Sequence, residues 1–159
     1  MTKELVPLKP DDVKLLIVHC SATRCDRNFS VEKLRATGIA KFGQASYHSY
    51  VRRNGSVVPI LPESVRGVHA VGYNHCSIAV CYEGGLDERG VATDTRTELQ
   101  KHALYALLKQ LRQDYPKARI IGHRELPRVA KKCPGFTASR EYSQLNGNQK
   151  LGKADFLSV

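Results

Sequence analysis

The 159-residue sequence contains no tryptophan, one methionine and four phenylalanines. Its apolar runs fall far short of the roughly 20 residues that cross a bilayer as a helix, which excludes a spanning helix of that kind. The first residues lack the basic-then-apolar order of a secretory signal peptide, so we expect synthesis and initial retention in the cytoplasm. The apolar fraction of 42% is typical of a globular protein, and the length suits one compact domain.

The five cysteines include no Cys-x-x-Cys pair, so a zinc-finger site has no support. Their odd number, without a signal peptide, favours free thiols over a disulfide framework. Cys20 and Cys81 lie in strand-like apolar runs and are predicted to be small buried side chains. Cys133 lies in a loop beside basic residues, where a thiolate is favoured.

Acidic residues are also few: 25 basic and 15 acidic side chains give a net charge of +10. This charge predicts attraction to polyanions such as nucleic acid, an anionic membrane surface or cell-wall polymer. A simple solvated surface is an equally open interpretation. No nucleic-acid-binding motif accompanies the charge, so we expect no specific nucleic-acid partner. The densest basic clusters are Arg52-Arg53, Arg128 with Lys131-Lys132, and Lys150 with Lys153.

Continuous apolar runs predict buried strands over residues 14–20, 77–82 and 118–121. Asn54-Gly55 predicts a hairpin between strands at 46–53 and 56–61. The segment 62–74 has no clean periodicity and is predicted to be irregular, as functional segments often are.

Three helices are predicted. Ser30 caps one that runs to about residue 42, and the capping box Thr95-x-x-Glu98 opens another that ends at Tyr115-Pro116. Thr137 caps a short third helix to about residue 145. The core-facing residues expected in the second helix are Leu99, Ala103, Ala106, Leu107 and Leu111.

The order strand, helix, hairpin, strand, helix, strand predicts a single α/β domain with a mixed central sheet flanked by helices. We expect a lead-in over residues 1–12, the domain over 13–145 and a C-terminal tail over 146–159.

Two histidines and one cysteine stand where strands end. His19 closes one apolar run, His123 follows another at Gly122, and Cys133 lies in the loop beyond. Two imidazoles and a thiolate bind zinc well, and three protein ligands leave a fourth position for water, as in catalytic zinc sites. Spacing alone leaves the alternative open that His19 is a core histidine and Cys133 an inert thiol.

Two further residues suit a hydrolytic site. Tyr47 begins a predicted strand, where a phenol can assist proton transfer or bind a developing oxyanion. Lys131 precedes Cys133 by two residues, so a metal bound at Cys133 brings its ammonium close. A packing aromatic and a solvated charge are the corresponding structural alternatives.

Several short segments occur together in a characteristic order. They resemble the zinc-dependent N-acetylmuramoyl-L-alanine amidases of the bacteriophage-lysozyme type, which share a superfamily with the peptidoglycan recognition proteins. The resemblance covers roughly residues 13–140. The segments are Ile17-Val18-His19-Cys20-Ser21-Ala22-Thr23, Tyr47-His48, Arg53-Asn54-Gly55, His69-Ala70-Val71-Gly72-Tyr73-Asn74-His75, Ser77-Ile78, Gly122-His123-Arg124-Glu125 and Lys131-x-Cys133-Pro134-Gly135.

The resemblance implies a zinc ion in a surface groove, and the residues that serve it are assigned by their matching positions. The implied reaction is hydrolysis of the amide between N-acetylmuramic acid and L-alanine in peptidoglycan or soluble muropeptides. The implied zinc ligands are His19, His123 and Cys133, the catalytic residues Tyr47 and Lys131, and the substrate contacts His69, Asn74 and His75.

Some superfamily members bind peptidoglycan without cutting it, and they typically lack the ligand cysteine; this is the rival function. We expect a monomer that does not insert into membranes. It acts on the wall after release from the cytoplasm, as phage lysis enzymes do, or recycles wall fragments in the cytoplasm.

Overall fold

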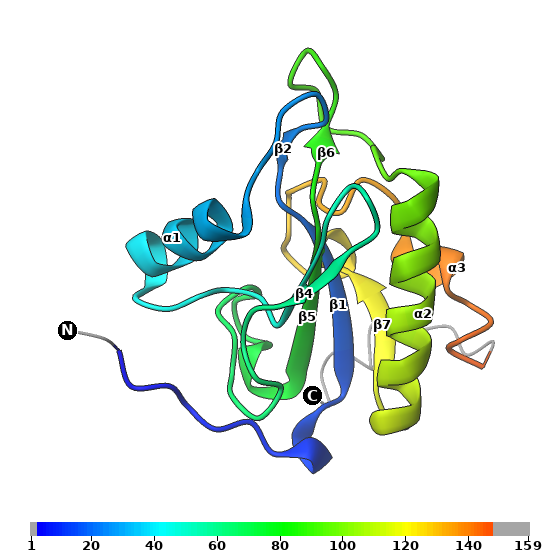
Figure 1. Ribbon diagram of the computed structural model, residues 1–159. Helices are drawn as coiled ribbons and strands as arrows, with labels where there is room; N and C mark the ends of the chain where they lie inside the picture. Colours follow the sequence, from blue (N-terminus) through cyan, green and yellow to red (C-terminus); the bar gives the residue numbers. More distant parts are fainter. Residues whose placement is uncertain (1–2, 148–159) are drawn as a thin grey trace.

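A five-stranded mixed sheet forms the centre of the computed structural model (Figure 1). The structure describes residues 3–147. The predicted tail therefore lies almost entirely outside the described residues. β1 pairs in parallel with both β5 and β7, and β3 pairs in parallel with β5, whereas the β3–β4 hairpin is antiparallel. The predicted mixed sheet is confirmed. Its strands are β1 (Leu15–Cys20), β3 (Ser49–Val51), β4 (Val57–Pro59), β5 (Ser77–Tyr82) and β7 (Arg119–Gly122), in the order β4-β3-β5-β1-β7.

β1 lies near the middle of the sheet because its sequence is apolar on both faces. All six of its residues are buried. Leu16 and Val18 belong to the core beneath α2 (Glu98–Asp114), while Ile17 packs on the opposite face. Because alternate residues of a strand share a face, His19 projects on the side of Ile17.

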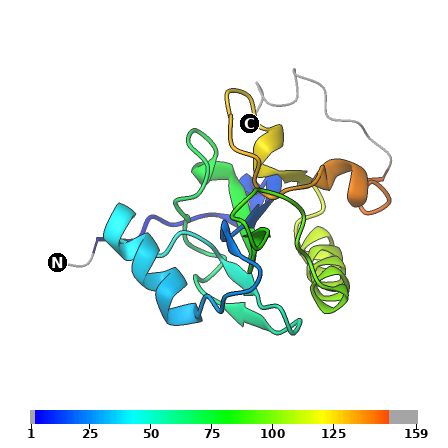
Figure 2. The same cartoon turned by 90° about the horizontal axis from the view of Figure 1, so that it is seen from above.

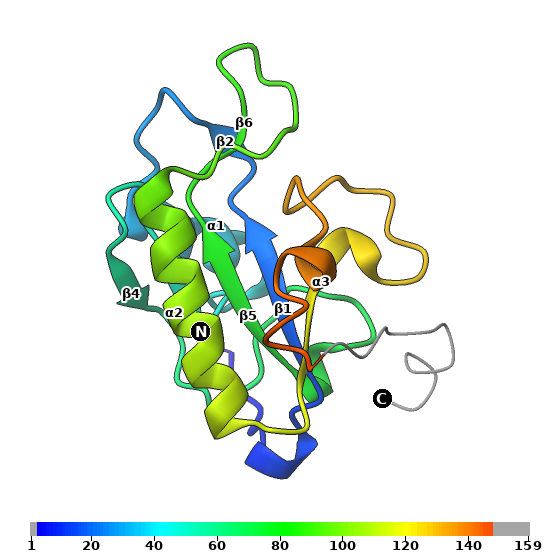
Figure 3. The same cartoon turned by 90° about the vertical axis from the view of Figure 1, so that its right-hand side faces the viewer.

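Helices cover both faces of this sheet. α2 and α3 (Ala138–Glu141) pack on one face (Figure 3), and α1 (Val31–Phe42) lies on the other side (Figure 2). The predicted N-cap of α1 is confirmed, since the Ser30 hydroxyl accepts a hydrogen bond from Lys33 N at 3.2 Å. None of the described helices is both long and apolar enough to cross a membrane.

The predicted capping box of α2 is wrong by two residues. The Thr97 hydroxyl accepts from Gln100 N at 3.1 Å, and Gln100 Oε1 accepts from Thr97 N at 2.9 Å. Thr95 instead accepts a hydrogen bond from Gly85 N at 2.7 Å. The sequence contains two overlapping capping motifs, Thr-x-x-Glu from Thr95 and Thr-x-x-Gln from Thr97. The helix begins at the second motif because the Thr95 hydroxyl is already bonded to the backbone of the preceding loop.

The predicted core-facing stripe of α2 is confirmed at Ala103, Leu107 and Leu111, which lie in the core or pack against it, and is wrong at the other two positions. Leu99 is 59% exposed and Ala106 is exposed, whereas the buried residues are Gln100, Leu104, Leu108 and Leu111. The helix is rich enough in apolar residues to carry two neighbouring stripes. Gln100 determines which stripe faces the core, because its buried amide donates hydrogen bonds to Val51 O and Glu83 O. The third helix, α3, begins after Thr137 as predicted but ends at Glu141.

The remaining regular pieces are short. β2 (Thr23–Arg24) and β6 (Gly85–Leu86) form a small parallel pair beyond the main sheet. Single 3₁₀ turns occur at Pro10–Asp12, Asn74–Cys76 and His123–Glu125. The lead-in packs on the irregular segment 62–76, since Leu8 is buried and its N–H donates to Ser64 O at 2.7 Å.

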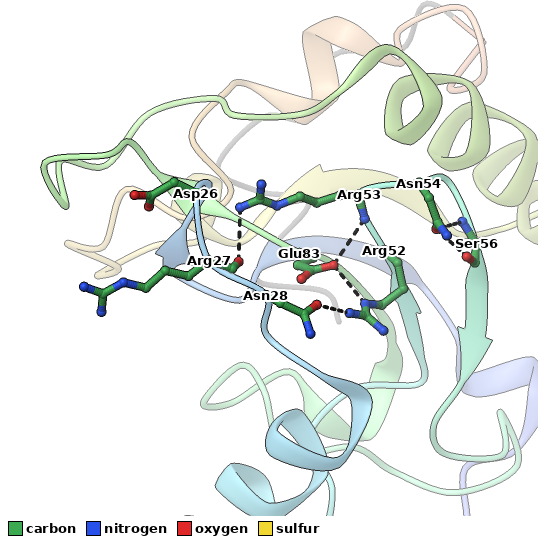
Figure 4. A pocket seen from close by; sticks show the side chains of 8 residues that line it. All are labelled: Asp26, Arg27, Asn28, Arg52, Arg53, Asn54, Ser56 and Glu83. Carbon is green, nitrogen blue, oxygen red and sulfur yellow. Dashed lines mark hydrogen bonds and ion pairs between the residues drawn. The ribbon is translucent and has the colours of Figure 1, made fainter.

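Glu83 ties the loop before α1 to the β3–β4 hairpin (Figure 4). Its carboxylate, 3% exposed, accepts hydrogen bonds from Arg52 Nε at 2.8 Å, Phe29 N at 2.9 Å and Arg53 N at 3.2 Å. These groups lie at a polar pocket of about 320 Å³. Because the carboxylate is satisfied within the protein, we interpret this pocket as a structural junction.

Replacing Glu83 with glutamine is expected to cost about 1.5–3 kcal/mol of unfolding free energy at neutral pH, the range for a hydrogen bond to a charged group. Burial alone would raise the pKa of Glu83, but the Arg52 and backbone donors outweigh burial and lower it. The stabilisation is therefore present above the ordinary value of 4.5 and is lost as pH falls through the lowered value. Urea unfolding of both proteins from about pH 7 to pH 3 measures this.

Glu88→Gln is the matched control, because Glu88 is exposed on the neighbouring loop. The stability difference between wild type and Glu83→Gln should shrink in acid. A difference that stays constant across the pH range would contradict the ion-pair assignment.

Candidate metal centre

The edge of the sheet brings His19 and His123 together. β1 and β7 are parallel neighbours, and Val18 pairs with Gly122. The next residue of each segment is a histidine, and the two ring centroids lie 4.6 Å apart. His19 is 1% exposed, so its ring is held within the protein rather than on a loop.

The loop after β7 returns Cys133 to the same place. Arg124 N donates to Cys133 O at 2.8 Å, which closes the loop beside His123. Tyr82 Oη fixes the following residue by donating to Pro134 O at 2.5 Å. A Cβ on Gly122 would lie 2.8 Å from Pro134 Cδ, so glycine is needed for this close approach.

The donor atoms of His19, His123 and Cys133 all lie within 4.8 Å of one another. Cys133 Sγ is 3.8 Å from His19 Nδ1. Zn–N and Zn–S bonds of about 2.0–2.3 Å place tetrahedral donors roughly 3.3–3.6 Å apart, so the donors must close by up to about 1.5 Å around the ion. Two imidazoles and a sulfur are also the donor chemistry that suits zinc. The residues therefore fit a zinc ion.

The protonation of these groups follows from burial. Burial lowers the pKa of His19 and of His123, and the positive charge of Lys131 lowers both further. Both rings are thus neutral near pH 7, as metal ligands must be. The hydrogen bond with the Cys20 thiol and burial raise the pKa of Cys133. A bound cation supplies the charge that converts such a thiol to a thiolate.

Tyr47 and Lys131 both lie beside the three donors. The Tyr47 ring centroid is 5.1 Å from that of His19. Burial raises the pKa of Tyr47, so its phenol stays protonated and is a hydrogen-bond donor. Lys131 is exposed, and its charge acts on both histidines.

The three predicted substrate contacts occupy different environments. His69 Nδ1 lies 2.9 Å from His19 Nε2, so His69 contacts a predicted metal ligand. The Asn74 side-chain oxygen accepts from the backbone N–H groups of His69 and Ala70, at 3.0 and 2.9 Å, and braces the turn between them. His75 is exposed on the adjacent 3₁₀ turn.

Sequence reasoning missed two supporting residues. The Glu125 carboxylate accepts from Gly122 N at 2.6 Å and Ser139 N at 3.1 Å, which holds the turn that carries His123. Ser77 Oγ lies 3.1 Å from His69 Nε2. A buried polar residue at the start of an apolar strand was the available signal for Ser77.

Comparison with known sequences agrees with this geometry. Residues 9–136 match the profile of the family described as N-acetylmuramoyl-L-alanine amidase. An endolysin of Enterobacteria phage K11 is 34% identical over 133 residues, which cover 83% of this chain and 87% of that protein. An endolysin of Escherichia phage T7 is 36% identical over 126 residues, covering 79% of this chain and 82% of that protein.

Solved structures share the fold. The N-acetylmuramoyl-L-alanine amidase LysCS of Clostridium intestinale superposes with a TM-score of 0.75 at 22% identity, covering 94% of this chain and 91% of that one. The bumblebee protein PGRP-SA gives 0.71 at 18% identity, with coverage of 90% and 87%. With the profile match over most of its length, the chain belongs to the N-acetylmuramoyl-L-alanine amidase family.

Proposed function

We propose that this protein is a zinc-dependent amidase that hydrolyses the bond between N-acetylmuramic acid and L-alanine in peptidoglycan. The observation that carries the proposal is the convergence of His19, His123 and Cys133, with donor atoms within 4.8 Å, in a chain of this family. Presence of Cys133 favours an enzyme over a module that only binds peptidoglycan.

In this mechanism, His19, His123 and Cys133 would hold the ion. Zinc bound there would supply Lewis acidity to the scissile carbonyl and to water, whose pKa a bound zinc lowers to about 7. The protonated Tyr47 phenol donates a hydrogen bond to the oxygen on which negative charge develops. The Lys131 ammonium adds positive charge on the exposed side of the site, where the substrate enters.

The proposed physiological substrate is wall peptidoglycan rather than a soluble fragment. The relatives from phages K11 and T7 are named endolysins, and a net charge of +10 favours adsorption to an anionic wall. We propose that the protein acts as a monomer after release from the cytoplasm. Asn74 and His75 are proposed to lie along the path of the muramyl peptide.

Purified sacculi and soluble muropeptides, each incubated with the protein, should yield new L-alanine amino termini. A zinc chelator should remove this activity, and added zinc should restore it, because no protein side chain in the site can replace the Lewis acidity of the ion. The release of amino termini and the loss of turbidity are the two measurements. Binding to sacculi without new amino termini would make the protein a recognition module, and new reducing sugar ends would indicate a glycosidase.

A further inference from the structure

A chain of three hydrogen bonds runs from His19 to the backbone. His19 Nε2 lies 2.9 Å from His69 Nδ1, and His69 Nε2 lies 3.1 Å from Ser77 Oγ. Ser77 Oγ donates to the carbonyl oxygen of Tyr73 at 2.6 Å. The His19 and His69 rings meet edge to face, with an interplanar angle of 83°.

The last acceptor, a backbone carbonyl oxygen, fixes the direction of donation along all three hydrogen bonds. A carbonyl oxygen only accepts, so the Ser77 hydroxyl proton points to Tyr73. The Ser77 oxygen then accepts from His69 Nε2–H, which leaves His69 Nδ1 with a lone pair. That lone pair accepts from His19 Nε2–H, and the remaining lone pair of His19 is on Nδ1. This is the nitrogen that lies 3.8 Å from Cys133 Sγ, on the metal side.

The hydrogen-bonded series begins and ends on two neighbouring strands. His19 is the fifth residue of β1, and Ser77 opens β5, where it pairs with Leu15. His69 therefore bridges from one end of this strand pair to the other. Its own position is held by the Asn74 side chain, which accepts from His69 N at 3.0 Å.

We infer that His69 and Ser77 are positioning residues that hold His19 in the tautomer and orientation needed to bind the metal through Nδ1. This inference rests on the proposed zinc site and gives His69 a role other than substrate contact. Histidine ligands commonly donate their second N–H to a carboxylate, a carbonyl or water. Here the acceptor is the Nδ1 lone pair of a neutral imidazole, which adds no negative charge beside the site.

The zinc affinity of purified variants tests the inference directly, by competition with a chromophoric chelator. His69→Phe keeps a ring but removes both nitrogens, and it should weaken zinc binding about 10- to 100-fold, as loss of an outer partner does. His69→Asn places an oxygen near the position of Nδ1 and should recover most of that loss. Ser77→Ala should weaken binding in the same direction, by a smaller factor.

His102→Phe is the matched control, because this histidine is exposed on α2 and should leave zinc affinity unchanged. Wild-type zinc affinity in both His69→Phe and Ser77→Ala, together with weaker muropeptide binding, would overturn the inference and make His69 a substrate contact. Should His69→Phe fail to fold, Ser77→Ala decides the question, and wild-type zinc affinity in that variant would overturn the inference.

The zinc measurements need no substrate, so they separate this inference from the proposed reaction. A protein that binds zinc with the predicted order of affinities but releases no L-alanine termini would support the positioning role and refute the amidase proposal. A wild-type protein that binds no zinc would overturn both.

Discussion

Replacing Cys133 with alanine is expected to abolish hydrolysis and to lower zinc affinity by more than about 100-fold. Loss of an outer partner alone costs about 10- to 100-fold, and loss of a direct ligand should cost more. The loss is expected to be large because the Cys133 thiolate is the one anionic donor among the three. Zinc content after dialysis and clearing of sacculi suspensions measure the two effects.

Cys25→Ala is the matched control for this change, because Cys25 is a half-buried free cysteine outside the donor set. It should keep both zinc and activity. A Cys133→Ser protein that retains full zinc content and full activity would remove Cys133 from the ligand set, and with it the proposed centre.

Replacing Tyr47 with phenylalanine should reduce kcat by about 10²- to 10³-fold, the usual cost of one oxyanion donor. Zinc affinity should not change, because the ring that packs 5.1 Å from His19 is kept and only the hydroxyl is lost. Steady-state kinetics on a soluble muropeptide, with zinc content measured in parallel, separates these effects.

Tyr105→Phe serves as the control, since Tyr105 is exposed on α2 and its hydroxyl is remote from the chemistry. An unchanged kcat in Tyr47→Phe would reduce Tyr47 to a packing aromatic. A higher KM with an unchanged kcat would instead indicate that Tyr47 contacts the substrate.

The sheet was predictable because its signals are local. Residues 15–18 and 78–82 are uninterrupted apolar runs within β1 and β5, which suit strands buried on both faces. Asn54-Gly55 marks the hairpin turn, and Gly55 has the positive φ of 86° that such turns require. The helix of residues 98–114 was predictable in extent, and its core face was predictable only in part. Its exact rotation depends on the hydrogen bonds of Gln100 to Val51 and Glu83.

The closeness of the three candidate metal donors was predictable in part. His19 lies near the end of β1 and His123 directly follows its parallel neighbour β7. Cys133 follows in the loop after His123, and its place in the set came from the family resemblance, because spacing alone left it open. The hydrogen bonds that link His69 with His19 and with Ser77 were not predictable. They depend on the path of the irregular segment 62–76, which has no periodicity to reveal which side chains face the sheet.

The wide separation of the donors in the sequence also determines when, during translation, the complete metal-binding set is first present. His19 and Cys133 are separated by 114 positions. At about 5–20 residues per second, translation leaves the first ligand without its last partner for on the order of ten seconds. Chains that terminate before Cys133 lack a complete donor set, so the proposed wall-cutting activity belongs only to products translated through that residue.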